Sequence, residues 1–361
     1  MSTRLSIEQP SQEATTFRKA LFAVLLGVIS FAAAASIIHL CIRSPLNLYA
    51  AVRSEKLAAF APWQGRATSA IFGSSHIHNG FDPRSFDQTL AATPLATTTF
   101  NLGVEGGSQS EQRVLALNFL KTLRPQPHQA CFVFLELNAG ANFTNNHLVH
   151  PRTIDIYDWR TLRFIHQLSP RSLGTQRALG RTSFGIVGSL LYYTNVGMLA
   201  NRIFTPPLDQ QMLTAETIQD RRGLYTPDQP AATAAVFQLF ADAGHAMTPA
   251  PEPLLPGNYA LLSELQRDSP IRGVHFIYVV SPRIDNLSSY PQYPAEITVD
   301  GVTTPILSMA RADLYPDLFP PAEWIDGAHL SAAGAGVLGR DLARQLLDYY
   351  QQHPQPMDCG G

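Results

Sequence analysis

The sequence predicts an α/β protein in which a mostly parallel sheet lies between two layers of helices, preceded by a hydrophobic N-terminal helix. Short apolar segments of strand length recur along the chain, and the clearest are 131–137 and 274–280. Amphipathic segments separate such strands, and one at 332–350 places leucines at helical spacing. Strands that alternate with helices indicate parallel pairing, with both faces of the sheet covered.

The composition fits a folded protein with few charged residues. Of 361 residues, 45% are hydrophobic and 15% are charged, and the formal net charge is −2. This length can bury one large core or two modest ones. Because the chain has no strong positive field, we do not expect it to bind nucleic acid. No motif indicates a cofactor, a metal ion or a nucleotide, and we expect none of them.

The three cysteines are Cys41, Cys131 and Cys359. Their spacing matches no metal site and shows no obvious disulfide framework. The cysteines therefore leave the cellular compartment open.

Residues 20–42 predict a transmembrane anchor, which would bring the protein to a membrane. The run contains no Asp, Glu, Lys or Arg, and as a helix it spans roughly 30 Å of hydrocarbon. The alternative is a signal peptide cleaved near 33–35, but apolar residues continue beyond that point. A short head at 1–19 and a long downstream part favour a cytoplasmic N-terminus, with the bulk of the chain outside the cytoplasm.

We expect a linker at 43–64, a domain at 65–352 and a tail at 353–361. Between about 152 and 256 the strand and helix pattern loosens, which predicts a helical insertion that covers or flanks the site. Within it, the apolar segment 183–204 contains polar residues and glycines. A buried or membrane-surface helix is therefore favoured there over a second membrane span.

The domain begins with predicted strands at 67–72 and 97–102. A helix through 113–120 follows the second strand, with Ser108 or Ser110 in the position of its N-cap. The strand at 131–137 comes next, so the chain alternates strand and helix from the start of the domain.

Polar residues and glycines follow three of the predicted strands. Ser75 follows the first strand after Gly73, where glycine allows a sharp turn. Gly106 lies in a loop after the second strand, and Asn138 follows the third. In parallel sheets the carboxyl ends of the strands form one edge, so these residues are expected to lie close together.

Asp326 and His329 precede the final helix, for which Ser331 is the predicted N-cap. A serine is a poor nucleophile without an adjacent base, and histidine suits that task when a carboxylate orients its ring. The Asp-x-x-His spacing lets one loop present both groups. Together with Ser75, the pair predicts a serine hydrolase or acyltransferase.

In four short blocks the sequence resembles the SGNH (GDSL-like) hydrolase superfamily, in the membrane-anchored branch that includes polysaccharide O-acetyltransferases and related esterases. The resemblance covers about 65–140 and 270–350, and it implies a flavodoxin-like three-layer sandwich. The blocks that carry it are Gly73-Ser74-Ser75, Asn101-Leu102-Gly103-Val104-Glu105-Gly106-Gly107-Ser108, Glu136-Leu137-Asn138-Ala139-Gly140 and Asp326-Gly327-Ala328-His329.

The resemblance also implies a role for each matching residue. Ser75 would be the nucleophile, His329 its general base and Asp326 the carboxylate that orients the base. The backbone N–H groups of Ser75 and Gly106, with the side-chain amide of Asn138, would form the oxyanion hole. Gly103 and Gly107 remain alternatives to Gly106.

What the resemblance implies for function is two-step acyl transfer through an acyl-enzyme. The substrate would be an acyl ester, above all acetyl, of a cell-envelope or exported polysaccharide, resolved by water or by a sugar hydroxyl. A carrier-bound acyl group, as in a relative that acts in cell-wall D-alanylation, is a further donor. The expected location is a bacterial-type inner membrane, single-pass, with an extracytoplasmic catalytic domain.

The chain departs from the family pattern at three positions. Ser74 replaces an aspartate, and Glu136 and Ala139 replace a glycine and an aspartate. These changes favour an alternative function, a catalytically inactive SGNH-like glycan-binding or assembly protein of the cell envelope. His76 and His78 are expected to be surface turn residues, with a part in substrate binding as the alternative.

Overall fold

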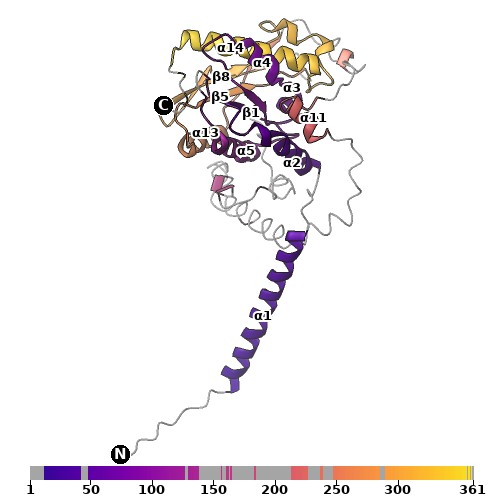
Figure 1. Ribbon diagram of the computed structural model, residues 1–361, viewed down its shortest axis with the longest axis vertical. Coiled ribbons are helices and arrows are strands. Elements are labelled where there is room, and N and C mark those ends of the chain that lie inside the picture. The colour runs from indigo at the N-terminus through magenta and orange to yellow at the C-terminus, as the bar shows by residue number, and fades with distance from the viewer. Residues whose placement is uncertain are drawn as a thin grey trace, which may run out of the picture.

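The computed structural model describes most of the predicted domain and the N-terminal helix (Figure 1). Asn138 and nearly all of 183–204 lie outside the described residues. The described ranges are 12–41, 48–126, 129–137, 213–226, 236–238, 247–284 and 289–355, together with the single positions 156, 160, 161, 163, 164, 183, 357 and 359.

A six-stranded sheet forms the centre of the domain, in the order β2-β1-β3-β5-β8-β7. The first five of these strands are parallel, and β7 pairs antiparallel with β8 at one edge. The strands are β1 (Ser69–Phe72), β2 (Thr99–Asn101), β3 (Phe132–Glu136), β5 (His275–Val280), β7 (Glu296–Val299) and β8 (Val302–Ser308).

The strand order places a topological switch point between β1 and β3. The chain moves outward from β1 to β2 and then returns to the other side of β1 to form β3. In sheets of this order, ligands bind outside the carboxyl ends of the strands at the switch point. Residues that follow β1 and β3 are therefore well placed to form a site.

Helices cover both faces of this sheet, so the prediction of an α/β fold with a mostly parallel sheet is confirmed (Figure 1). Side chains alternate along each strand: Phe72 and Leu135 belong to one core, and Ile71 and Phe134 to the other. The first core includes α2 (Leu48–Phe60), α5 (Gln109–Thr122) and α13 (Pro256–Asp268), and the second includes α3 (Ser75–Gly80), α4 (Pro83–Leu90) and α14 (Ala332–Gln352).

Smaller elements complete the described part of the chain. A separate pair of parallel strands forms from β4 (Thr248–Pro251) and β6 (Ser289–Gln292). The helix α11 (Ala215–Asp220) belongs to the predicted insertion, and the backbone N–H of Tyr225 beyond it donates to the carbonyl of His78 in α3 (3.1 Å). Short 3₁₀ helices cover Ala61–Trp63, Pro316–Leu318 and Pro321–Glu323.

Two serines cap helices as predicted. Ser331 precedes α14, and its hydroxyl accepts a hydrogen bond from the Gly334 N–H (3.2 Å). Ser108 precedes α5 and forms a reciprocal capping box with Glu111. The loop between β2 and α5 therefore ends at Ser108, where the capping box fixes the start of the helix.

The helix α2 packs on the domain, within the segment predicted as a linker at 43–64. Arg53 forms a buried ion pair with Glu111 of α5 (2.9 Å), and Lys56 is also buried. From residue 48 onward, the chain is thus folded against the layer that contains α5.

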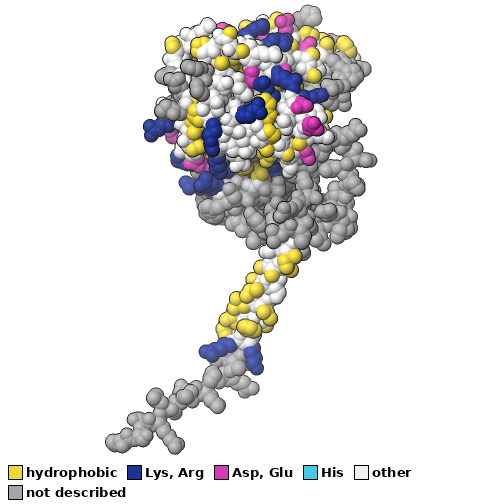
Figure 2. All heavy atoms as spheres, viewed as in Figure 1, with side chains coloured by type: hydrophobic (Ala, Val, Ile, Leu, Met, Phe, Trp, Pro, Cys, Tyr) yellow, Lys and Arg dark blue, Asp and Glu magenta, His cyan; other side chains and the backbone are white. Residues whose placement is uncertain are grey.

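The N-terminal helix α1 (Gln12–Cys41) is apolar and exposed (Figure 2). Basic side chains lie near its N-terminal end, and apolar side chains such as Phe22 and Ile29 cover its surface. Within the described residues it is the one helix long and apolar enough to cross a membrane, with Thr16–Ala34 as the candidate span. Its length and composition suit a membrane anchor or a signal sequence.

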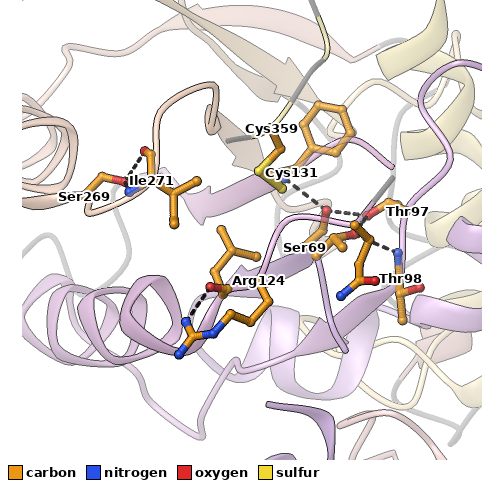
Figure 3. The surroundings of a disulfide bond; sticks show 12 residues. Ser69, Thr97, Thr98, Arg124, Cys131, Ser269, Ile271 and Cys359 are labelled. Carbon is orange, nitrogen blue, oxygen red and sulfur yellow. Dashed lines mark hydrogen bonds between the residues drawn. A yellow bond between two sulfur atoms is a disulfide. The ribbon is translucent and has the colours of Figure 1, made fainter. Parts of the chain in front are cut away.

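A disulfide joins Cys131 to Cys359 (Figure 3). It ties the chain near its C-terminus to the residue before β3. The cysteine spacing showed no obvious disulfide framework, because the two cysteines are 228 residues apart and only the folded sheet brings them together.

Candidate functional site

The turn after β1 carries the predicted nucleophile. Ser74 is the N-cap of α3, and Ser75 is the first residue of that helix and is half-buried. A Cβ atom on Gly73 would lie 2.6 Å from Glu136 Oε2, so only glycine fits this close approach of β1 to the end of β3. The turn thus brings Ser75 to the carboxyl edge of the sheet, next to the switch point.

Asp326 and His329 form the predicted carboxylate–imidazole pair. His329 Nδ1 lies 2.8 Å from Asp326 Oδ2, and Asp326 Oδ1 accepts the backbone N–H groups of Ala328 (2.8 Å) and His329 (2.9 Å). Burial raises the pKa of Asp326, but the hydrogen bonds from the His329 ring and these N–H groups outweigh it, so the pKa lies below its usual value. An ionised Asp326 can only accept, so it keeps the ring proton on Nδ1 and leaves Nε2 as the basic atom.

Backbone contacts fix the loop that presents this pair. Trp324 and Leu330 form an isolated antiparallel bridge, and the Ile325 N–H donates to the His329 carbonyl (2.8 Å). The Ile284 N–H, from the segment after β5, donates to the Gly327 carbonyl (3.0 Å). The Asp–His pair is therefore held by its own hairpin-like loop and by the end of a neighbouring strand.

His329 reaches α3, the helix that begins at Ser75. Its ring stacks on that of His76 with 5.9 Å between centroids. His329 Nε2 is buried and has no hydrogen-bond partner among the described residues, so the Ser75–His329 hydrogen bond of a working triad is not formed. Such catalytic hydrogen bonds are often long without substrate and tighten when it binds.

The loop after β2 packs against the turn that carries Ser75. The Val104 N–H donates to the Gly73 carbonyl (3.0 Å), and a Cβ atom on Gly107 would overlap the same carbonyl. Gly106 is exposed and has a positive φ of 57°, which favours glycine. The two predicted oxyanion donors of the backbone, Ser75 and Gly106, thus belong to segments in direct contact.

Asn101 at the end of β2 holds these segments together. Its buried amide donates to the carbonyls of Ile77 (2.7 Å) and Phe81 (2.9 Å), and its Oδ1 accepts the Gly103 N–H (2.9 Å). Asn101 of the second block therefore joins α3 to the loop. Asn138, the third predicted oxyanion donor, lies outside the described residues.

Glu136 is the functional candidate that sequence reasoning missed. This buried carboxylate accepts the Ser74 N–H, the Ser74 hydroxyl (3.1 Å) and, at 2.9 Å, His76 Nδ1. Burial raises its pKa, but the hydrogen bond and charge of His76 and the donors of Ser74 outweigh burial and lower the pKa. The sequence offered one signal for this contact: Ser74 and Glu136 both depart from the SGNH pattern. In the structure these two residues contact each other.

His78 is buried, so the prediction of a surface turn residue was wrong for it, whereas His76 is partly exposed. His78 stacks on Tyr225 at 4.4 Å between ring centroids and has Nδ1 2.7 Å from Lys56 Nζ. Lys56 also donates to the Gly103 carbonyl. Burial lowers the pKa of Lys56 and, with the Lys56 charge, that of His78. The side chain of His78 turns inward because the short helix α3 packs on the loop after β2.

Within the described part of the chain, no group of three or more His, Cys, Asp or Glu residues is arranged to hold a metal ion. The fold and the site define an α/β protein with a carboxylate–histidine pair and a serine turn at the carboxyl edge of its sheet. Comparison with protein-family models, with curated proteins and with solved structures finds no match to this chain.

Proposed function

We propose that the protein is a membrane-anchored serine esterase or O-acyltransferase of the SGNH type. The observation that supports this most is the Asp326–His329 pair. Asp326 holds the Nδ1 side of the ring, Nε2 has no hydrogen-bond partner among the described residues, and the ring stacks on His76 of α3, the helix that Ser75 begins. The same groups serve hydrolysis and transfer, because the two reactions differ only in the acceptor.

The proposed mechanism is acyl transfer in two steps. His329 removes the hydroxyl proton of Ser75 as Oγ attacks the ester carbonyl, and Asp326 stabilises the imidazolium that forms. The N–H groups of Ser75 and Gly106, with the amide of Asn138, stabilise the oxyanion. Water or a sugar hydroxyl then releases the acyl group from Ser75.

The proposed substrate is an acylated carbohydrate or other envelope polymer outside the cytoplasm. The apolar helix α1 supports a membrane tether, and the Cys131–Cys359 disulfide supports an oxidising compartment. In this arrangement the domain lies on the extracytoplasmic side of a bacterial-type inner membrane.

The test is labelling of the full chain, purified in detergent micelles, with a fluorophosphonate serine probe. We expect stoichiometric labelling that is lost in Ser75→Ala and kept in the matched control Ser263→Ala, which removes a serine of α13 far along the chain from the site. Labelling that survives in Ser75→Ala but disappears in Ser74→Ala would move the nucleophile to the neighbouring residue.

The second candidate is a non-catalytic envelope protein that binds glycans. The unpartnered His329 Nε2 favours it, because the Ser–His hydrogen bond is not formed among the described residues. This candidate predicts that a folded wild-type chain binds acetylated polymer and is not labelled. Labelling dependent on Ser75 excludes it.

A further inference from the structure

A second histidine with its own carboxylate lies beside His329. His76 directly follows Ser75 in α3, and its Nδ1 is 2.9 Å from Glu136 Oε1 at the end of β3. The rings of His76 and His329 lie 5.9 Å apart between centroids, with an interplanar angle of 27°. The site therefore contains two imidazole–carboxylate pairs, whereas acyl transfer by a single triad requires one.

In both pairs the same ring nitrogen, Nε2, makes no hydrogen bond to a described residue. Ionised Glu136 can only accept hydrogen bonds, so Nδ1 of His76 carries a proton, just as Asp326 keeps one on Nδ1 of His329. Within the described residues, every hydrogen bond to the two rings is made at Nδ1. Each Nε2 is thus available to exchange a proton with a substrate or with Ser75.

The two carboxylates differ in their exposure to water. The side chain of Glu136 is 6% exposed, and that of Asp326 is 54% exposed. Water screens the charge of Asp326 more, so a proton on the paired imidazole is stabilised more strongly beside Glu136. Two rings this close also disfavour a second positive charge. The two pairs therefore give their imidazole rings unequal electrostatic surroundings.

Among the described residues, α3 also carries a buried titratable group, His78, whose Nδ1 lies 2.7 Å from Lys56 Nζ. His78 interacts electrostatically with both His329 and Lys56, and Lys56 in turn interacts with Glu105.

We propose that His76 is a second catalytic acid–base residue, which exchanges a proton with the alcohol oxygen of the substrate while His329 exchanges one with Ser75. In acylation, His329 takes the Ser75 proton as Oγ bonds to the acyl carbon. The bond from that carbon to the alcohol oxygen breaks, and His76 gives its Nε2 proton to the leaving oxygen. His329 is then protonated and His76 is neutral.

Deacylation reverses the two transfers. The incoming hydroxyl gives its proton to His76 as its oxygen bonds to the acyl carbon. The Oγ–acyl bond breaks, and His329 returns its proton to Ser75. Protons and charges balance over the cycle, and no further reactant is needed. The inference rests on the proposed function, because it assigns a role within the same acyl-transfer reaction.

Two acetyl esters with different leaving groups test this role in the full chain in detergent. Nitrophenolate leaves p-nitrophenyl acetate without a proton, whereas the sugar alkoxide of glucose pentaacetate needs one as it leaves. For His76→Ala we expect kcat/KM to fall by about 10²–10⁴ with the sugar ester and by less than about tenfold with the nitrophenyl ester. Added imidazole should restore part of the first loss.

Three further variants sharpen the comparison. His329→Ala should lose turnover of both esters, and Glu136→Gln should repeat the His76→Ala pattern with a smaller loss. His353→Ala, which removes an exposed histidine at the end of α14, is the matched control and should leave both rates unchanged. If His76→Ala does not fold, His76→Gln keeps a polar side chain of similar size and provides the same comparison.

The outcomes are separable. Equal losses with both esters in His76→Ala would mean that His76 only supports the turn, and would overturn the inference while the proposed function stands. A folded wild-type chain without Ser75-dependent turnover of either ester would overturn the proposed function, and the inference with it.

Discussion

At the scale of single residues, the site depends on carboxylates that the protein keeps ionised in different surroundings. Glu136 is buried and receives three donors, whereas Asp326 is exposed and receives the His329 ring and two backbone N–H groups. Both pKa values lie below their usual range. The hydrogen bonds to each carboxylate therefore also fix the tautomer of the histidine that it holds.

Asp326→Asn tests this orienting role. The amide can present an N–H to Nδ1, which favours the tautomer with the proton on Nε2 and removes the base. If the proposed function holds, we expect kcat for an acetyl ester to fall by about 10³–10⁴ with little change in thermal stability, the cost of losing the orienting carboxylate in serine triads. A loss of less than about tenfold, measured by steady-state kinetics beside a circular dichroism melt, would mean that Asp326 does not orient the base.

The buried carboxyl group of Asp87, outside the candidate site, should make the stability of the protein depend on pH. Burial raises its pKa to about 6, against the opposing hydrogen bonds from Thr99 and Arg222. A raised carboxyl pKa means that the folded state binds the proton more tightly than the unfolded state. The stabilisation is fully present below the ordinary aspartate pKa and is lost as pH rises through about 6.

Urea unfolding of wild type and Asp87→Asn between pH 4 and pH 7 measures this effect. We expect the free energy of unfolding of the wild type to decrease by about 1–3 kcal/mol over this window relative to the variant. Parallel pH profiles for the two proteins would show that Asp87 stays ionised throughout.

At the scale of elements, close backbone packing positions the loop after β2, which carries the predicted oxyanion donor Gly106. A Cβ atom on Gly107 would overlap the Gly73 carbonyl, and one on Gly103 would lie 2.7 Å from the His78 nitrogen. Asn101 ties the same loop to α3 through three hydrogen bonds. The loop and the serine turn therefore move together, and a change in one displaces the other.

Gly107→Ala is expected to displace this loop from the turn. We expect a loss of about 1–3 kcal/mol in the free energy of unfolding. The turnover of an acetyl ester should fall by about 10²–10³, the usual cost of one oxyanion donor. Urea unfolding and kcat on the same preparations measure both.

The matched control for this change is Gly336→Ala, in the interior of α14. Its Cβ atom would make only ordinary contacts, the nearest at 3.4 Å. Alanine should stabilise the helix by about 0.5–1 kcal/mol and leave turnover unchanged. If both alanine variants lost turnover equally, the loop would have no special part in the site.

At the scale of the whole molecule, a covalent bond joins a central strand of the sheet to the segment after the last helix. The Cys131–Cys359 disulfide connects the start of β3, a central strand, to the tail after α14 (Figure 3). Because the bond closes a very long loop, it restricts the unfolded chain strongly. Its persistence also requires an oxidising compartment, in agreement with the proposed extracytoplasmic domain.

Cys359→Ala should lower the free energy of unfolding by about 2–5 kcal/mol, and reduction of the wild type should have a similar effect. The control Cys41→Ala should leave stability unchanged. Thiol titration of the unfolded, unreduced chain should find a single reactive thiol, that of Cys41. Three reactive thiols in protein isolated from its native membrane would place the domain in a reducing compartment.

The sequence by itself determined some of the elements and their kinds. The apolar runs at 131–137 and 274–280 form central strands, and Ser331 caps the last helix. Both features could be predicted because the apolar pattern of a strand and the cap of a helix are set by residues close together in the sequence. Local spacing likewise predicted the Asp326–His329 pair, since three residues of one loop suffice to bring the two side chains together. Ser75 and Gly106 remain predicted site residues, in segments that now prove to be in contact.

Only the tertiary structure decided the contacts between distant segments. Glu136 meets Ser74 and His76 across 62 and 60 residues of sequence, and Cys131 meets Cys359 across 228. The buried positions of His78 and Lys56 were equally invisible in the sequence. Such pairs depend on the order of strands in the sheet, which brings β3 beside β1, and no local periodicity encodes that order.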